Sequence, residues 1–257
     1  MKRYLKLAAL VVGVLLLTIV AVVAATFLGR QSITDGVEVD GVRIVKDGIV
    51  SIGVVPVGSG QVALVDAGND AAGKAILAEL ARRQLGSDAV IAILITHGHQ
   101  DHTAGIKLFP KARVVALERE VGLVEGTEGP HGPVTQLMPV SPTGVKVTWP
   151  VRDGDTLTVG QASVRVFAVP GHTAGSAAYL VSGVLFLGDA ADTNDAGVVS
   201  GSPWIFSDSQ AQDRASLAHL AQVLQQEHAE VKALAFAHSG VRMEGLAPLV
   251  AFAQRNP

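Results

Sequence analysis

Cysteine is missing from the 257 residues of this sequence. Its absence excludes disulfide bonds, thiolate metal ligands and a cysteine nucleophile. It leaves the cellular compartment open, because a protein without cysteine suits either side of a membrane. A metal site in this chain would have to use histidine and carboxylate ligands.

Positive charge is also scarce once the first residues are set aside. Residues 1–30 hold four basic residues and no acid, so the remainder has 16 basic and 23 acidic residues, a net charge of −7. Nucleic-acid binding needs a basic surface that neutralises phosphates, so we expect no nucleic-acid partner. The charge favours a small-molecule substrate, and the length suits one domain with a substantial core over residues 37–257.

The N-terminal segment contains a long uncharged run. Leu7–Gly29 carries no charge and follows basic residues at positions 2, 3 and 6. As a helix, residues 7–28 would span roughly 33 Å, about the hydrocarbon thickness of a bilayer. We therefore predict a transmembrane anchor or signal peptide over residues 1–30, which would make the membrane a partner, and a polar linker over residues 31–36.

Two fates of this segment stay open. The run is longer than the apolar region of a typical signal peptide, which favours a retained anchor, whereas Val23-Ala24-Ala25 would suit cleavage. The positive-inside rule places the basic start in the cytoplasm. The predicted localisation is a single-pass membrane protein with the domain of residues 37–257 extracytoplasmic. The alternative is a secreted or periplasmic protein after cleavage.

Short runs rich in valine and isoleucine, broken by glycine, follow residue 36 and are typical of strands. Strands are expected at residues 37–45, 49–57, 61–65, 89–95, 145–149, 156–159, 163–169, 177–181, 184–187 and 231–237, and helices at residues 71–85, 209–227 and 246–254. Two sets of strands, each followed by helices, indicate an α/β (α+β) fold of two packed sheets with helices outside.

A cluster of candidate metal ligands directly follows the strand expected at residues 89–95. The segment THGHQDH contains His97, His99, Asp101 and His102. Neutral imidazole and carboxylate suit zinc, iron or manganese. We expect a tight loop, made possible by Gly98, to gather these side chains at the strand end. The alternative is a polar loop with exposed histidines.

Three further candidates stand just beyond apolar strands. His172 follows the strand expected at residues 163–169, Asp189 follows residues 184–187, and His238 follows residues 231–237. Alone, a histidine or aspartate at a strand end is usually an ordinary loop residue. Three of them in the same context favour a shared site.

Four segments stand in order along the chain: THGHQDHTAG, PGHTAGS, FLGDA and FAHSG. They resemble the successive motifs of the metallo-β-lactamase fold superfamily, in its glyoxalase-II-like branch of hydrolases, over roughly residues 37–257. The resemblance implies an αββα four-layer sandwich with two divalent metal ions, most often Zn²⁺, at one edge between the sheets. By position, the implied ligands are His97, His99 and His172 for the first ion, Asp101, His102 and His238 for the second, and Asp189 for both.

The resemblance also implies a mechanism. Two ions ~3.5–4 Å apart would share a hydroxide that attacks a carbonyl or phosphoryl centre. Asp101 would be a ligand and a candidate for orienting that nucleophile. Asp66, in LVDAG, would accept a hydrogen bond from a metal-bound histidine and fix its tautomer. The alternative for Asp66 is a turn aspartate beside a helix.

Differences from the motifs of related families narrow the range of expected substrates. One β-lactamase group has a cysteine where Asp189 stands, and the flavodiiron oxygen reductases have a glutamate in place of His99. Lactone-cleaving relatives have a tyrosine soon after the bridging aspartate, where this chain has Ala-Ala-Asp. We expect hydrolysis of a thioester, ester or lactone-type small molecule, with β-lactamase or phosphodiesterase activity as further alternatives.

Alternatives remain open for the residues that line the pocket and for the reaction class. His131, in the loop 126–142, and Trp204 and Phe206 are expected to border the pocket, although the two aromatic residues could equally belong to the core. The rival functions are a sulfur dioxygenase with one iron ion and a non-catalytic, membrane-anchored binding protein. Metal content separates the dioxygenase from the hydrolase.

Overall fold

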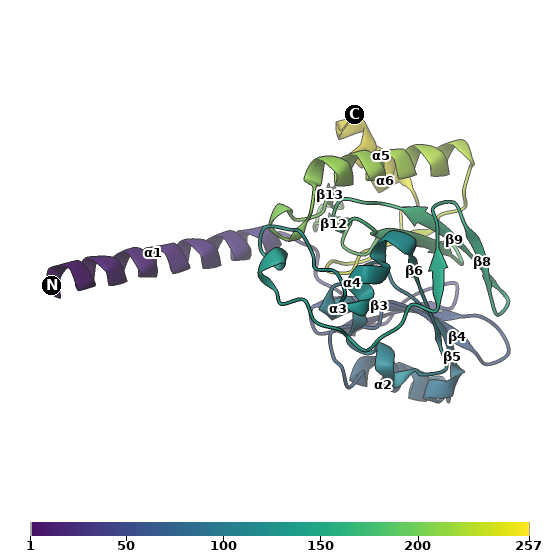
Figure 1. Cartoon of the computed structure of the whole chain (residues 1–257). Helices are drawn as coiled ribbons and strands as arrows, with labels where there is room; N and C mark the ends of the chain where they lie inside the picture. The colour runs from purple at the N-terminus through teal and green to yellow at the C-terminus, as the bar shows by residue number, and fades with distance from the viewer. Residues whose placement is uncertain (1, 257) are drawn as a thin grey trace.

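The structure is a computed structural model that describes residues 2–256, and Figure 1 shows a long helix projecting from a body of sheets and flanking helices. The larger sheet contains, in this order, β1 (Val37–Val39), β2 (Val42–Asp47), β3 (Val50–Pro56), β4 (Val62–Val65), β5 (Val90–Leu94), β6 (Arg113–Leu117) and β7 (Trp149–Val151). Neighbouring strands are antiparallel up to β4 and parallel from β4 to β7.

The second sheet has the strand order β14 (Ala233–Ala235), β11 (Val184–Phe186), β10 (Ala177–Val181), β9 (Ala162–Ala168) and β8 (Thr156–Val159). Within it, β11 and β14 are parallel, and the other pairs are antiparallel. A separate ribbon pairs β12 (Ala191–Thr193) with β13 (Val199–Gly201). The described helices of four residues or more are α1 (Lys2–Phe27), α2 (Lys74–Arg82), α3 (Gln100–Thr103), α4 (Val121–Glu125), α5 (Gln210–Gln226) and α6 (Ala247–Arg255).

Three apolar clusters arrange these elements in layers. The central cluster joins the two sheets, with Leu94 from β5 packed in the same cluster as Tyr179 from β10. A second cluster covers the outer face of the larger sheet with α2, and a third covers the outer face of the second sheet with α5 and α6. Because each sheet is buried on both faces, its central strands are continuously apolar, as in β5. The expected two packed sheets with helices outside are therefore present.

Some expected elements differ because local polar groups redirect the backbone. The strand expected at 37–45 is a hairpin, since Asp40 and Gly41 both have positive φ angles, of 49° and 81°, and form the turn between β1 and β2. The helix expected at 71–85 begins only at Lys74. The carboxylate of Asp70 accepts from the Ala72 amide at 2.9 Å and closes a turn before it.

The strand expected at 145–149 is displaced to β7. The hydroxyl of Thr143 accepts from the Val145 amide at 3.1 Å, and the carboxylate of Glu125 accepts from the Val147 amide at 3.1 Å. These two amides are bonded to side chains and take no part in a ladder between strands. The sheet edge therefore starts later, at Trp149.

The apolar N-terminal run forms α1, but its predicted role is not upheld. Crossing a bilayer takes about 20 consecutive, mostly apolar residues in one helix. Within residues 2–256, no helix has the combination of length and apolarity that a membrane crossing requires. The predicted single-pass localisation with an extracytoplasmic domain is therefore wrong. The secreted or periplasmic alternative depended on the same segment and is withdrawn with it.

The polar segment between α1 and β1 is bonded to the body of the protein. The Gln31 amide donates to the Thr193 carbonyl at 2.9 Å, and the Gly240 amide donates to the Gln31 carbonyl at 3.2 Å. Further along, the carboxylate of Asp35 accepts from the Lys46 amide at 2.8 Å. This segment is thus bonded to β12, to the loop after β14 and to β2 of the larger sheet.

Tyr179 ties the second sheet to the strand end that precedes the ligand loop. Its buried hydroxyl donates to the Ile95 carbonyl at 2.9 Å. We expect Tyr179→Phe to lower the free energy of unfolding by about 1–3 kcal/mol, because the buried carbonyl loses this partner. Chemical denaturation measures the change, and Tyr4→Phe, at an exposed tyrosine, is the matched control. Equal stability of the two variants would contradict this role.

Candidate metal centre

All seven predicted ligands lie beyond strand ends at one edge of the two sheets. His97 and His99 follow β5, and α3 carries Asp101 and His102 directly after them. In the second sheet, His172 follows β9, Asp189 follows β11 and His238 follows β14. These three strands run in the same direction, because β9 and β11 are both antiparallel to β10 and β14 is parallel to β11. Their carboxyl ends therefore meet at the same edge.

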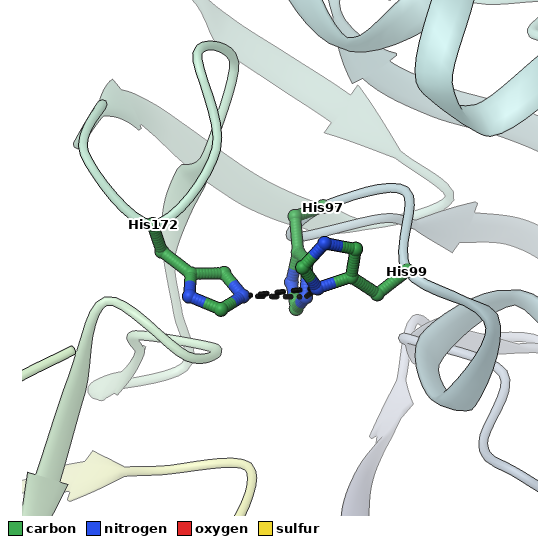
Figure 2. A group of neighbouring side chains, drawn as sticks. All are labelled: His97, His99 and His172. Carbon is green, nitrogen blue, oxygen red and sulfur yellow. Dashed lines mark hydrogen bonds between the residues drawn. The ribbon is translucent and has the colours of Figure 1, made fainter. Parts of the chain in front are cut away.

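Three imidazoles converge on one point, as Figure 2 shows. His97 Nε2 lies 3.0 Å from His99 Nδ1 and 3.2 Å from His172 Nε2, and the last two atoms are 3.1 Å apart. Three nitrogens bound to one tetrahedral zinc ion would be about 3.3 Å apart. The spacing of these nitrogens suits a single metal ion.

A second group contains Asp101, His102 and His238, and Asp189 lies between the two groups. Its Oδ1 lies 3.3 Å from His102 Nε2, and its Oδ2 lies 3.1 Å from His238 Nε2 and 3.5 Å from His172 Nε2. Asp101 Oδ2 is 3.3 Å from His238 Nε2. Asp189 alone faces histidines of both groups with its two oxygens.

The electrostatics of this cluster favour bound cations. Burial, with the neighbouring imidazoles, lowers the pKa of His97 well below its usual value, and burial lowers that of His172 to about 3. Burial opposes the charge of Asp189, but His238 and His102 hold its pKa well below the usual range. Burial also opposes a charge on His238, yet Asp189 and Asp101 raise its pKa to about 10. Neutral imidazoles and ionised carboxylates are the forms that bind metals, so an ion at His238 would replace the proton that Asp189 and Asp101 stabilise there.

The donor set fits metal ions. His102 Nε2 and Asp189 Oδ1 are buried and have no hydrogen-bond partner among the described residues. Buried polar atoms without partners are costly, and metal coordination satisfies both a ring nitrogen lone pair and a carboxylate oxygen. A set of imidazoles and carboxylates without thiolates suits zinc, iron or manganese.

Asp66 forms a hydrogen bond with the Nδ1 atom of His102. Its Oδ2 accepts from His102 Nδ1 and from the Thr96 hydroxyl, each at 2.8 Å, and its Oδ1 accepts from the Thr96 amide at 2.8 Å. Its backbone has a φ of 62°, an uncommon conformation for a residue with a side chain. These bonds leave the Nε2 lone pair of His102 directed at the other ligands. Asp66 therefore lies directly after β4 and accepts from one of the candidate ligands, His102.

We expect Asp66→Asn to lower metal affinity by about 10- to 100-fold, the usual loss when such a supporting carboxylate is removed. Asparagine has one acceptor oxygen, so its NH₂ group would face either the Thr96 amide or the His102 and Thr96 side-chain donors that the carboxylate now accepts. Competition with a chromogenic chelator measures the affinity. Asp47→Asn is the matched control, since the Asp47 carboxylate likewise accepts from backbone amides, those of Asn69 and Asp70, but touches no candidate ligand. An unchanged metal affinity in the Asp66→Asn variant would contradict the assignment of Asp66 as the carboxylate that supports His102.

Glu120 joins two ligand loops, and the sequence reasoning missed it. Its Oε1 accepts from the Gly98 amide at 2.7 Å and from the Thr173 hydroxyl at 2.9 Å. Gly98 lies between two ligands, and Thr173 follows His172. Burial raises the pKa of Glu120 to about 7, although the Gly98 amide and the Thr173 hydroxyl oppose the shift. The available signal was its position shortly after the apolar strand β6.

Glycine is required at position 98 because a side chain there has no room. The sequence alone indicates a different reason, the freedom of glycine to form a tight loop. A Cβ at this position would lie 2.7 Å from the Val124 backbone nitrogen and 2.8 Å from the Leu123 carbonyl carbon. Both atoms belong to α4, so the ligand loop packs directly against a helix backbone. Any side chain at residue 98 would push the loop away from α4.

A cavity of about 400 Å³ opens onto the centre. Its wall includes ligands of both groups together with Ile49, Met138 and Phe206, and also Phe27 and Arg30 from the N-terminal segment. Phe206 thus lies in the wall, as expected. Trp204 borders a neighbouring cavity of about 580 Å³ instead, and His131 is an exposed residue that lines neither.

Comparisons with known proteins agree with this picture. A family model described as the Metallo-beta-lactamase superfamily matches residues 45–238. The hydroxyacylglutathione hydrolase of Shewanella sp. (strain ANA-3) is 39% identical over 103 residues, which are 39% of this chain and 34% of that protein. The hydroxyacylglutathione hydrolase of Halorhodospira halophila is 36% identical over 132 residues, 51% of this chain and 42% of that protein. The chain therefore spans less than half the length of either relative.

Solved structures share the fold. The subclass B3 metallo-beta-lactamase of Bradyrhizobium japonicum matches with a TM-score of 0.63 and 21% identity, over 89% of this chain and 93% of that chain. A metallo-beta-lactamase family protein from Thermus thermophilus matches with a TM-score of 0.58 and 25% identity, over 84% of this chain and 79% of that chain.

Proposed function

Because the chain belongs to the metallo-β-lactamase superfamily, we propose that it is a two-metal hydrolase of a small thioester, ester or lactone. The observation that carries the proposal is the pair of ligand groups that share Asp189. We assign His97, His99 and His172 to one ion and Asp101, His102 and His238 to the other. Zinc is the proposed metal, and iron and manganese suit the same donors.

Two bound divalent ions would polarise the substrate oxygen and lower the pKa of water to near neutrality. The chain's own residues position the reactants. Asp66 and Glu120 fix the ligand loops through the hydrogen bonds described above. Asp101 is the ligand carboxylate most exposed to the cavity, with 26% of its side chain accessible, so it can orient a water molecule toward the substrate.

The wall of the cavity suits an acyl group. Ile49, Met138 and Phe206 give it apolar surface close to the ligands. The curated relatives named above are thioester hydrolases by name, which supports a thioester ahead of an ester or a lactone. Since the match covers under half of those proteins, glutathione itself is not assigned as part of the substrate.

A substrate panel on the zinc-loaded full chain tests the proposal. S-acyl thioesters, simple esters, lactones, β-lactams and phosphodiesters are compared, with metal content measured on the same samples. The expected result is two metal ions per chain and thioester turnover that ends when a chelator removes the metal. One iron ion per chain with oxygen consumption would favour the sulfur dioxygenase. No stoichiometric metal and no turnover would favour a binding protein.

A further inference from the structure

Arg30 is a buried cation in the wall of the catalytic cavity, contributed by the segment that follows α1. Its Nη2 lies 2.9 Å from Asp192 Oδ2, and both side chains are nearly buried, at 12% and 5% exposed. The guanidinium lies 4.5 Å from the centre of the Phe27 ring. A backbone bridge pairs Arg30 with Asn194, beside β12. The side chain is thus held in place before any ligand arrives.

One end of this guanidinium has no acceptor. Arg30 Nη1 is buried and has no hydrogen-bond partner among the described residues. Arginine carries five N–H donors in a plane, and a buried donor without an acceptor is costly. Nη2 is paired with Asp192, so Nη1 is the donor that a bound water molecule or a ligand could satisfy.

Arg30 borders the neighbouring cavity of about 580 Å³ and also the cavity that contains the candidate ligands. Arg30 lines this cavity together with Asp189 and His238, and it is the one lysine or arginine among the described residues of its wall. Phe27 and Phe206, whose ring centres are 6.0 Å apart, form apolar surface beside it. A ligand at the metal centre therefore meets an apolar wall and a cationic group in the same cavity.

We propose that Arg30 binds a carboxylate on the acyl part of the substrate, an inference that rests on the proposed hydrolase function. The substrate class is then an acyl thioester or ester with a second, uncleaved carboxylate. A carboxylate offers two coplanar oxygens that suit the guanidinium, and charge-assisted hydrogen bonds are about twice as strong as neutral ones.

Binding measurements test this without relying on turnover. The zinc-loaded full chain is titrated by calorimetry with ω-mercaptocarboxylates, from 3-mercaptopropionate to 6-mercaptohexanoate, and with alkanethiols of matched length. The thiolate binds zinc in both series, so the carboxylate is the variable. We expect at least one carboxylate probe to bind about 10- to 100-fold more tightly than its matched thiol. Arg30→Met should abolish that preference and leave the alkanethiols within a few-fold.

The ion pair needs its own control, since Arg30→Met leaves Asp192 buried without its partner. The double variant Arg30→Met with Asp192→Asn removes both charges and should show the same loss of preference. The proposal is wrong if the wild type shows no preference at any length, or if either variant keeps it. It is also wrong if both variants weaken both series equally, since Arg30 would then only hold the wall.

The substrate panel distinguishes failure of the proposed hydrolase function from failure of the proposed Arg30 site. Carboxylate preference in calorimetry without turnover of any thioester, ester or lactone would contradict the proposed function while leaving the Arg30 site intact. Turnover with no carboxylate preference in binding would contradict the Arg30 site alone.

Discussion

Asp189→Asn is expected to lower kcat/KM by about 1,000-fold or more, a loss of roughly 4 kcal/mol in transition-state stabilisation. The two carboxylate oxygens face different histidines, at 3.3 Å from His102 Nε2 and 3.1 Å from His238 Nε2. Asparagine has one oxygen, so its NH₂ group would point a donor at one of the two ligand groups. Metal analysis should show loss of at least one ion per chain.

A matched variant separates this effect from a general cost of changing a buried aspartate. Asp213 in α5 is also buried, accepts from the Ser202 amide at 3.0 Å and belongs to neither ligand group. Asp213→Asn should keep two metal ions and stay within about 10-fold of wild-type kcat/KM. Full metal content and near-normal turnover in Asp189→Asn would remove the case for a shared ligand.

Asp101→Asn is expected to lower kcat by about 100- to 1,000-fold, with KM changed by only a few-fold. Burial opposes ionisation of Asp101, but His102 and His238 lower its pKa, so the native group is a carboxylate. Asparagine keeps the size and one oxygen but loses the charge and one acceptor. The effect should fall on kcat, because the group would act on the nucleophile and not on the acyl chain.

Steady-state kinetics at saturating zinc provide the measurement for Asp101→Asn. Excess zinc matters because it separates weakened metal binding from a lost role in orienting the nucleophile. A kcat restored by zinc would limit Asp101 to ligation. A kcat near wild type without added zinc would exclude both roles.

The family, the enzyme class and most strands could be predicted because their signals are local. The comparisons confirm the superfamily and the class of metal-dependent hydrolase. The THGHQDH segment places four candidates directly after a buried strand, and β10 spans the residues expected. Valine-rich strands buried on both faces need no knowledge of their neighbours to be recognised.

The supporting residues could not be predicted, because their partners are distant in the chain. Glu120 bonds Thr173 across 53 positions. Arg30 falls within the segment that the sequence assigned to an anchor, and its pairing with Asp192 exists only in the folded chain. The displaced strand near residue 145 has a similar cause, since its amides are taken by side chains at positions 125 and 143.

The candidate ligands lie where the two sheets meet at one edge, and this determines when during folding the metal centre can form. The first half of the chain supplies four candidate ligands and the second half supplies three, so neither half contains a complete pair of sites. Folding intermediates in which only one sheet has formed would lack the shared carboxylate or its histidines. The proposed binding of two ions would therefore require both halves of the chain, and it would be gained only once the interface between the two sheets has formed.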